Sequence, residues 1–111
     1  MSANETIKKG EVIHVADSVG YAIGAIVSKT ILKQEKGNIT LFSFDAGQGL
    51  SEHTAPFDAL VHVVEGEAQV SIGGEPRLVR EGEIVIMPAG VPHALHAEKP
   101  FKMVLTMIRG A

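Results

Sequence analysis

The sequence has no cysteine, no tryptophan and few aromatic residues of any kind. The absence of cysteine excludes a disulfide framework, a thiolate zinc site and a cysteine nucleophile. It also fits a reducing compartment, and we expect the protein to be cytoplasmic. Because aromatic side chains are scarce, aliphatic residues and methionine must fill the core of this 111-residue chain.

The sequence also lacks blocks of like charge and long apolar runs. The formal net charge is −3, without a block of like charge, so there is no basic face to hold a nucleic-acid backbone. No apolar run approaches the ~18 residues of a membrane span, and the polar N-terminus contains none of signal-peptide length. We therefore expect no nucleic-acid or membrane partner, and a loosely held leader over about residues 1–10.

The sequence does contain many short apolar segments rich in β-branched residues, separated by glycine and proline turns. The clearest are residues 25–33, 39–44, 59–64, 68–72, 78–80, 84–87, 93–97 and 101–108, and residues 11–19 are a weaker edge-strand candidate. Short strands with turn signals about 8–12 residues apart, and no convincing helix, are typical of an antiparallel sandwich or barrel. The sequence predicts a single all-β domain over residues 1–111.

Two stretches each place a histidine at a strand edge, beside glycines and prolines that shape turns. Residues 47–66 have the spacing G-x5-H followed by a final glycine, and residues 82–97 have the spacing G-x5-P-x-G-x2-H. The residues that carry these patterns are Gly47, His53, Gly66, Gly82, Pro88, Gly90 and His93. At these positions the chain resembles the cupins, over roughly residues 39–108. The resemblance implies one small cupin domain folded as a double-stranded β-helix, the jelly-roll barrel also called RmlC-like.

The first motif is degenerate with respect to that family. Metal-binding cupins typically hold one metal ion with three histidines and a glutamate as ligands. This chain has Ala55 in place of the second histidine, Ala59 in place of the glutamate, and Ala97 in place of an asparagine of the second motif. Carried over position by position, only His53 and His93 remain as metal ligands.

The two histidines leave two interpretations open. They hold a divalent transition metal (Fe, Mn, Ni, Cu or Zn), or they are hydrogen-bonded histidines inside a polar pocket. Because such a metal usually needs three protein ligands and water, the first interpretation requires a third ligand. Asp58 would supply it if Pro56 imposes a bulge that re-aims the side chain. Strict alternation instead makes Ala59 the inward position and leaves Asp58 to cap backbone N–H groups of the turn.

Alternation also predicts the wall of a pocket beside the two histidines. The residues expected to line it are Phe44, Ala55, Ala59, Val61, Met87, Met103 and Leu105. The same alternation places His62 and His96 outside the barrel.

The outward positions of residues 59–64 and 101–108 are apolar as well, and a sheet that is apolar on both faces is normally covered on both. We therefore expect a homodimer in which this sheet packs against a second copy.

The function that these features predict is a barrel pocket for a small, largely apolar molecule. His53 and His93 would be its polar anchors, with or without a divalent metal. In a metal-free binder, the alanines at two former ligand positions would enlarge the cavity. The alternative is a metal-dependent oxygenase or isomerase acting on a small organic substrate, and a structural dimeric domain without a ligand is a third hypothesis. No residue pattern identifies a catalytic residue or a substrate.

Overall fold

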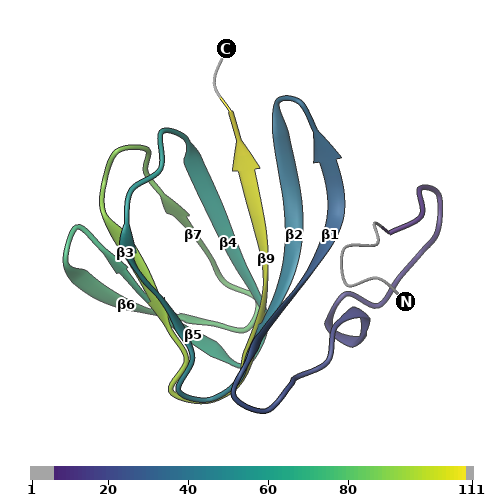
Figure 1. The fold of residues 1–111 in the computed structure, drawn as a ribbon, viewed down its shortest axis with the longest axis horizontal. Coiled ribbons are helices and arrows are strands. Elements are labelled where there is room, and N and C mark those ends of the chain that lie inside the picture. Colours follow the sequence, from purple (N-terminus) through teal and green to yellow (C-terminus); the bar gives the residue numbers. More distant parts are fainter. Residues whose placement is uncertain (1–6, 110–111) are drawn as a thin grey trace.

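The computed structural model describes residues 7–109, which form one short 3-10 helix and nine β-strands (Figure 1). The helix is η1 (Ala16–Ser18), and the strands are β1 (Ile26–Gln34), β2 (Gly37–Phe44), β3 (Gly49–His53), β4 (Asp58–Glu65), β5 (Glu67–Ile72), β6 (Glu75–Arg80), β7 (Ile84–Met87), β8 (His93–His96) and β9 (Phe101–Ile108). Residues 1–6 of the expected leader lie outside the described residues. No helix within residues 7–109 is both long and apolar enough to span a bilayer.

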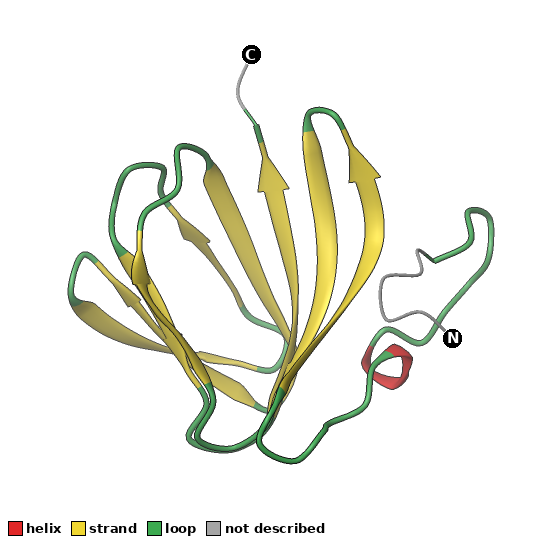
Figure 2. Cartoon of the chain, viewed as in Figure 1, coloured by secondary structure: helices red, strands yellow, loops and turns green. Residues whose placement is uncertain are grey.

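The strands form two antiparallel sheets that face each other (Figure 2). One sheet has five strands in the order β1-β2-β9-β4-β7, and the other has four in the order β3-β8-β5-β6. The chain crosses between the sheets repeatedly. One crossing is the turn between β4 and β5, where Gly66 has a φ of +75°. The predicted all-β jelly-roll architecture is confirmed.

Two segments differ from expectation. Residues 11–19 contain η1 instead of an edge strand, and they lie against the outer face of β9, where Lys102 Nζ donates a hydrogen bond to Ala16 O. Conversely, Gly49–His53 form β3, although four of the five residues are exposed. Pairing with β8 supplies the ladder of this strand, so its formation depends on a distant partner and not on local apolar character.

The core lies between the sheets and consists mainly of aliphatic side chains. It also contains two fully buried phenylalanines, Phe44 and Phe101, whose ring centroids are 4.5 Å apart. In β4, Val61 and Val63 are fully buried on the inward face, in alternation with half-buried outward neighbours. The period of two that the sequence shows therefore corresponds to the inner and outer faces of the sheet.

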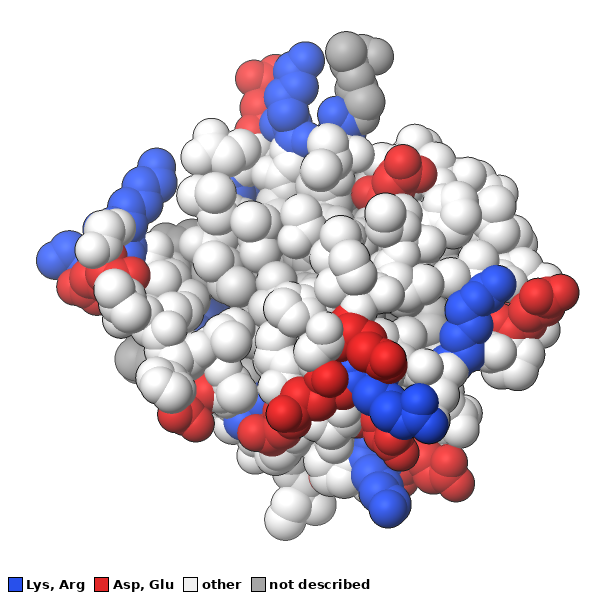
Figure 3. Space-filling model, turned by 180° about the vertical axis from the view of Figure 1, so that it is seen from behind, with Lys and Arg blue, Asp and Glu red and all other residues white. Residues whose placement is uncertain are grey.

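The outer face of the five-stranded sheet is covered over only part of its width. On β2, the buried Ser43 donates a hydrogen bond through Oγ to Gly20 O at 2.8 Å, so the N-terminal segment covers this part. On β7, at the other edge, Ile84 and Ile86 remain 58% and 55% exposed. Figure 3 shows acidic and basic side chains interspersed around uncharged surface on the face in view.

Candidate functional site

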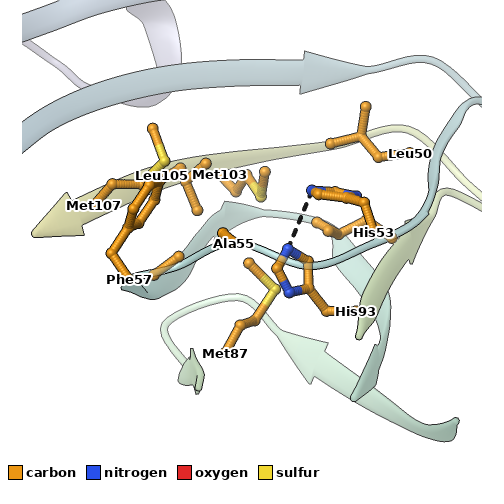
Figure 4. A pocket seen from close by; sticks show the side chains of 11 residues that line it. Leu50, His53, Ala55, Phe57, Met87, His93, Met103, Leu105 and Met107 are labelled. Carbon is orange, nitrogen blue, oxygen red and sulfur yellow. Dashed lines mark hydrogen bonds between the residues drawn. The ribbon is translucent and has the colours of Figure 1, made fainter. Parts of the chain in front are cut away.

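Two histidines from neighbouring strands meet at one end of the barrel. His53 ends β3 and His93 begins β8, and the two are direct partners in the ladder between these strands. Their Nε2 atoms are 3.2 Å apart, and the ring planes lie at 70° to each other (Figure 4). The structure therefore brings together the two histidines that the motifs singled out.

A bulge in β3 gives His53 its direction. Between the pairs Leu50–Leu95 and His53–His93, β3 advances by three residues while β8 advances by two. The extra residue places Leu50 and His53 on the same face, although strict alternation would put them on opposite faces. Both side chains consequently point into the barrel.

The two motif loops are tied to each other by backbone hydrogen bonds beside this pair. Gly90 N–H donates to Ala55 O at 2.8 Å, which joins the second motif to the first. Gly90 has a φ of +74°, a conformation that glycine adopts without strain. Asp58 Oδ1 accepts a hydrogen bond from Ala89 N–H at 2.8 Å in the same loop.

The hydrogen bonds of the histidines define which nitrogen carries the proton. His53 Nδ1 lies 2.8 Å from Ser51 O, and a carbonyl oxygen only accepts, so Nδ1 of His53 is the donor. In the neutral ring, His53 Nε2 is then an acceptor. His93 Nδ1 lies 3.4 Å from Val91 O, beyond the usual range for an N–H···O bond, whereas its Nε2 lies 3.2 Å from the His53 acceptor. His93 therefore donates through Nε2 to His53.

Burial disfavours a charge on the His93 ring. The His93 side chain is only 4% exposed. Burial lowers the pKa of His93 below its ordinary value of 6.5, and the charge of neighbouring His53 lowers it further, while the Val91 carbonyl acts in the opposite direction. An added proton would thus be poorly stabilised at this position.

The pair stands at the wall of a cavity of about 200 Å³. The other nine lining residues have apolar side chains: Leu50, Ala55, Phe57, Ala59, Met87, Leu95, Met103, Leu105 and Met107. The five of these that the sequence predicted are Ala55, Ala59, Met87, Met103 and Leu105. Leu50 and Phe57 were missed because they lie in an unpredicted strand and a loop, whereas Leu95 could have been found from its spacing to His93.

Two residues expected on the cavity wall do not line it. Phe44 and Val61 are fully buried in the core cluster between the sheets. Phe44 is paired with Phe101 at the start of β9, whereas Met107 near the end of the same strand lines the cavity. Alternation predicts the face of a residue correctly but not its depth along the barrel, and this explains the error.

The structure does not bring Asp58 to the histidine pair. Its carboxylate is engaged with Ala89 N–H, as expected for a residue that caps a turn. Within residues 7–109 no group of three or more His, Cys, Asp and Glu side chains is arranged to hold a metal ion. His62 and His96 are not among the residues that line the cavity.

The donor set of this site differs from the four-ligand set of metal-binding cupins. Ala55 and Ala59, at two of the four ligand positions, line the cavity with methyl groups. A transition metal bound here would have two imidazoles as protein ligands, whereas such sites usually have three protein ligands. The residues present therefore do not fit that metal centre. They form an apolar cavity in which the two histidines are the polar lining residues.

Comparison with known proteins supports this assignment of the fold. Residues 40–109 match a family model described as the cupin domain. A conserved protein of unknown function from Streptococcus pyogenes is 34% identical, with a TM-score of 0.90 and coverage of 100% of this chain and 97% of that one. A cupin 2 conserved barrel domain protein from Leptotrichia buccalis is 40% identical, with a TM-score of 0.85, over 87% of this chain and 47% of that one. An uncharacterized protein from Streptomyces coelicolor is 34% identical over 65 residues, which span 59% of this chain and 62% of that one. The chain belongs to the cupin family.

Proposed function

We propose that this cupin binds a small, largely apolar molecule in its barrel cavity, with His53 and His93 as the polar anchors. The observation that carries the proposal is the composition of the cavity wall. Nine apolar side chains surround the single pair of hydrogen-bonding imidazoles. Ligand pockets are typically lined in this way, by apolar surface with a few placed polar groups. We place this activity in the cytoplasm, in keeping with the absence of cysteine.

The size of the cavity suits a molecule with one ring or a short chain. Its volume is about 200 Å³, and an engineered apolar cavity of about 150 Å³ is known to admit benzene. Met87, Met103 and Met107 contribute flexible thioether side chains, which adapt to ligands of different shape. Ala55 and Ala59 leave open the space that larger side chains would fill.

A metal-dependent oxygenase or isomerase acting on a small organic substrate is the alternative function. It would require His53 and His93 to hold an iron, manganese, nickel, copper or zinc ion whose remaining positions are taken by water or substrate. The two functions differ in one measurable respect. Direct binding needs only the cavity and the histidine pair, whereas the enzyme needs the metal as well.

We would test the proposal by titrating toluene into protein whose methionine methyl groups are labelled for NMR. Three of the four methionines line the cavity, so their signals report its occupancy. We expect these signals to shift in the wild-type protein and to stay in place in Ala55→Leu, in which a larger side chain fills the cavity. Ala94→Leu is the matched control, because Ala94 does not line the cavity. Equal shifts in Ala55→Leu, or no shift at millimolar toluene, would contradict the proposal.

The same titration separates the two functions when it is repeated after chelator treatment, with metal content measured by elemental mass spectrometry. We expect binding to persist in metal-depleted protein. If iron, manganese, nickel, copper or zinc is present at near-stoichiometric level and its removal abolishes binding, the metal-dependent alternative is favoured. In that case the double variant His53→Ala, His93→Ala should be purified without the metal.

We also propose that the protein is a homodimer in which the outer face of β9, β4 and β7 packs against a second copy. Ile84, Ile86 and Ile108 on this face are 58%, 55% and 66% exposed in the single chain. They adjoin the half-buried Leu60 and Val104 through the ladder of these three strands. The polar Thr106 and His62 lie among them on the same face. Exposed apolar side chains gathered on one sheet face are typical of an interaction surface.

A further inference from the structure

The hydrogen bonds of the histidine pair run in one direction, from the buried ring toward the mouth of the cavity. His93 Nε2–H donates to His53 Nε2 over 3.2 Å, and His53 Nδ1–H donates to Ser51 O over 2.8 Å. Ser51 O, as a carbonyl, cannot donate. Its short contact to Nδ1 therefore makes Nε2 the acceptor of the neutral His53 ring.

Among the described residues, no carboxylate lines the cavity to stabilise a second proton on the pair. The other residues on the cavity wall are apolar, and within residues 7–109 no third His, Cys, Asp or Glu completes a cluster with the two rings. A charge on the buried His93 ring would lack an anionic partner on the cavity wall, which makes it unfavourable. The pair therefore offers a ligand one acceptor, His53 Nε2, and one donor, His93 Nε2–H.

From this polarity we infer that the cavity selects uncharged molecules that carry a hydroxyl group at one end of a small apolar body, that is, alcohols or phenols. The inference rests on the proposed function and names the chemical class of its ligand. A hydroxyl inserted between the rings donates to His53 Nε2 and accepts from His93 Nε2–H, so two hydrogen bonds replace one. An ether or ketone can only accept, and it leaves the acceptor on His53 without a donor. A carboxylate likewise can only accept, and the apolar wall of the cavity offers its charge no cationic side chain.

The experiment compares four probes of similar size by NMR titration: phenol, anisole, toluene and benzoate. Phenol has a hydroxyl, anisole has only an acceptor, toluene has neither, and benzoate is charged. One additional hydrogen bond corresponds to a preference of about fivefold. We therefore expect phenol to bind at least about fivefold more tightly than anisole, and benzoate to bind most weakly.

The matched variant is His53→Leu, which removes the acceptor and retains an apolar side chain of similar size. Because His53 is exposed, the variant should fold, and an unchanged far-UV circular dichroism spectrum and melting temperature would show that the barrel is intact. We expect the preference for phenol over anisole to disappear in His53→Leu. It should persist in His96→Leu, where an exposed histidine of the same strand β8 as His93 is replaced away from the cavity.

An independent measurement needs no ligand. The nitrogen chemical shifts of His53 should show that the ring proton resides on Nδ1, and His53 protonated on Nε2 would overturn the inference. Equal affinities for phenol and anisole would overturn the inference while leaving the apolar cavity of the proposed function in place. Preferred binding of benzoate would show that the pair carries a proton and would overturn it as well. If none of the four probes binds, the proposed function itself fails.

Discussion

The turn at Gly66 offers a sharp test of how the two sheets are held together. Gly66 connects β4 of the five-stranded sheet to β5 of the four-stranded sheet, with a φ of +75°. A Cβ at this position would lie 2.6 Å from Pro100 O and 3.1 Å from Phe101 Cβ. Phe101 is fully buried and stacked on Phe44, so it cannot move aside easily. We predict that Gly66→Ala destabilises the fold by two separate effects.

The first effect is backbone strain, because a residue with a Cβ at positive φ costs about 1–2 kcal/mol. The second is the steric overlap with Pro100 and Phe101, and forced shifts of this kind in a packed region cost about 1–3 kcal/mol. Gly82→Ala is the matched control, since Gly82 also has a positive φ, of +84°, but a Cβ there meets no atom of the described residues within 4 Å. It should show only the first effect.

The assay is urea unfolding followed by far-UV circular dichroism, because the chain has no tryptophan to report by fluorescence. Gly66→Ala should lower the free energy of unfolding by about 2–5 kcal/mol, and Gly82→Ala by about 1–2 kcal/mol. If the two variants agree within about 0.5 kcal/mol, the close approach of Pro100 and Phe101 has no energetic role and the reasoning is refuted.

Three further predictions concern the surface and the loops. Sedimentation at micromolar concentration should give the mass of a dimer for the wild-type protein and of a monomer for Ile86→Glu, whereas a wild-type monomer would contradict the proposed interface. Burial and the hydrogen bond to Glu65 raise the pKa of Tyr21 above its ordinary value of 10.0. The stabilising effect of Tyr21 should therefore be complete below pH 10 and decline above it, a loss that thermal melting should detect in the wild-type protein and not in Tyr21→Phe. Asp58→Ala should lower the free energy of unfolding by about 1 kcal/mol through loss of the bond to Ala89 N–H, and it should leave toluene binding unchanged. A loss of ligand binding in that variant would instead place Asp58 in the site.

Local sequence patterns were sufficient for most of the strands and turns of this protein. The β-branched segments and the period of two predicted eight of the nine strands, since an apolar face on a pleated strand must be buried. Glycines at turns marked the ends of the strands, because Gly66, Gly82 and Gly90 all adopt positive φ. The spacing of the two motifs also singled out the two histidines that meet across β3 and β8.

The tertiary structure alone decided how these elements combine into a site. The bulge in β3 turns His53 toward His93, and strict alternation from Leu50 would have turned it away. Phe44 and Val61 point inward as predicted, yet they are fully buried in the core and do not line the cavity. Asp58 bonds to Ala89, 31 residues away, and this contact draws it into the loop. Each of these outcomes depends on register between strands or on contacts between distant segments, whereas a local pattern reports only which face of a strand is apolar.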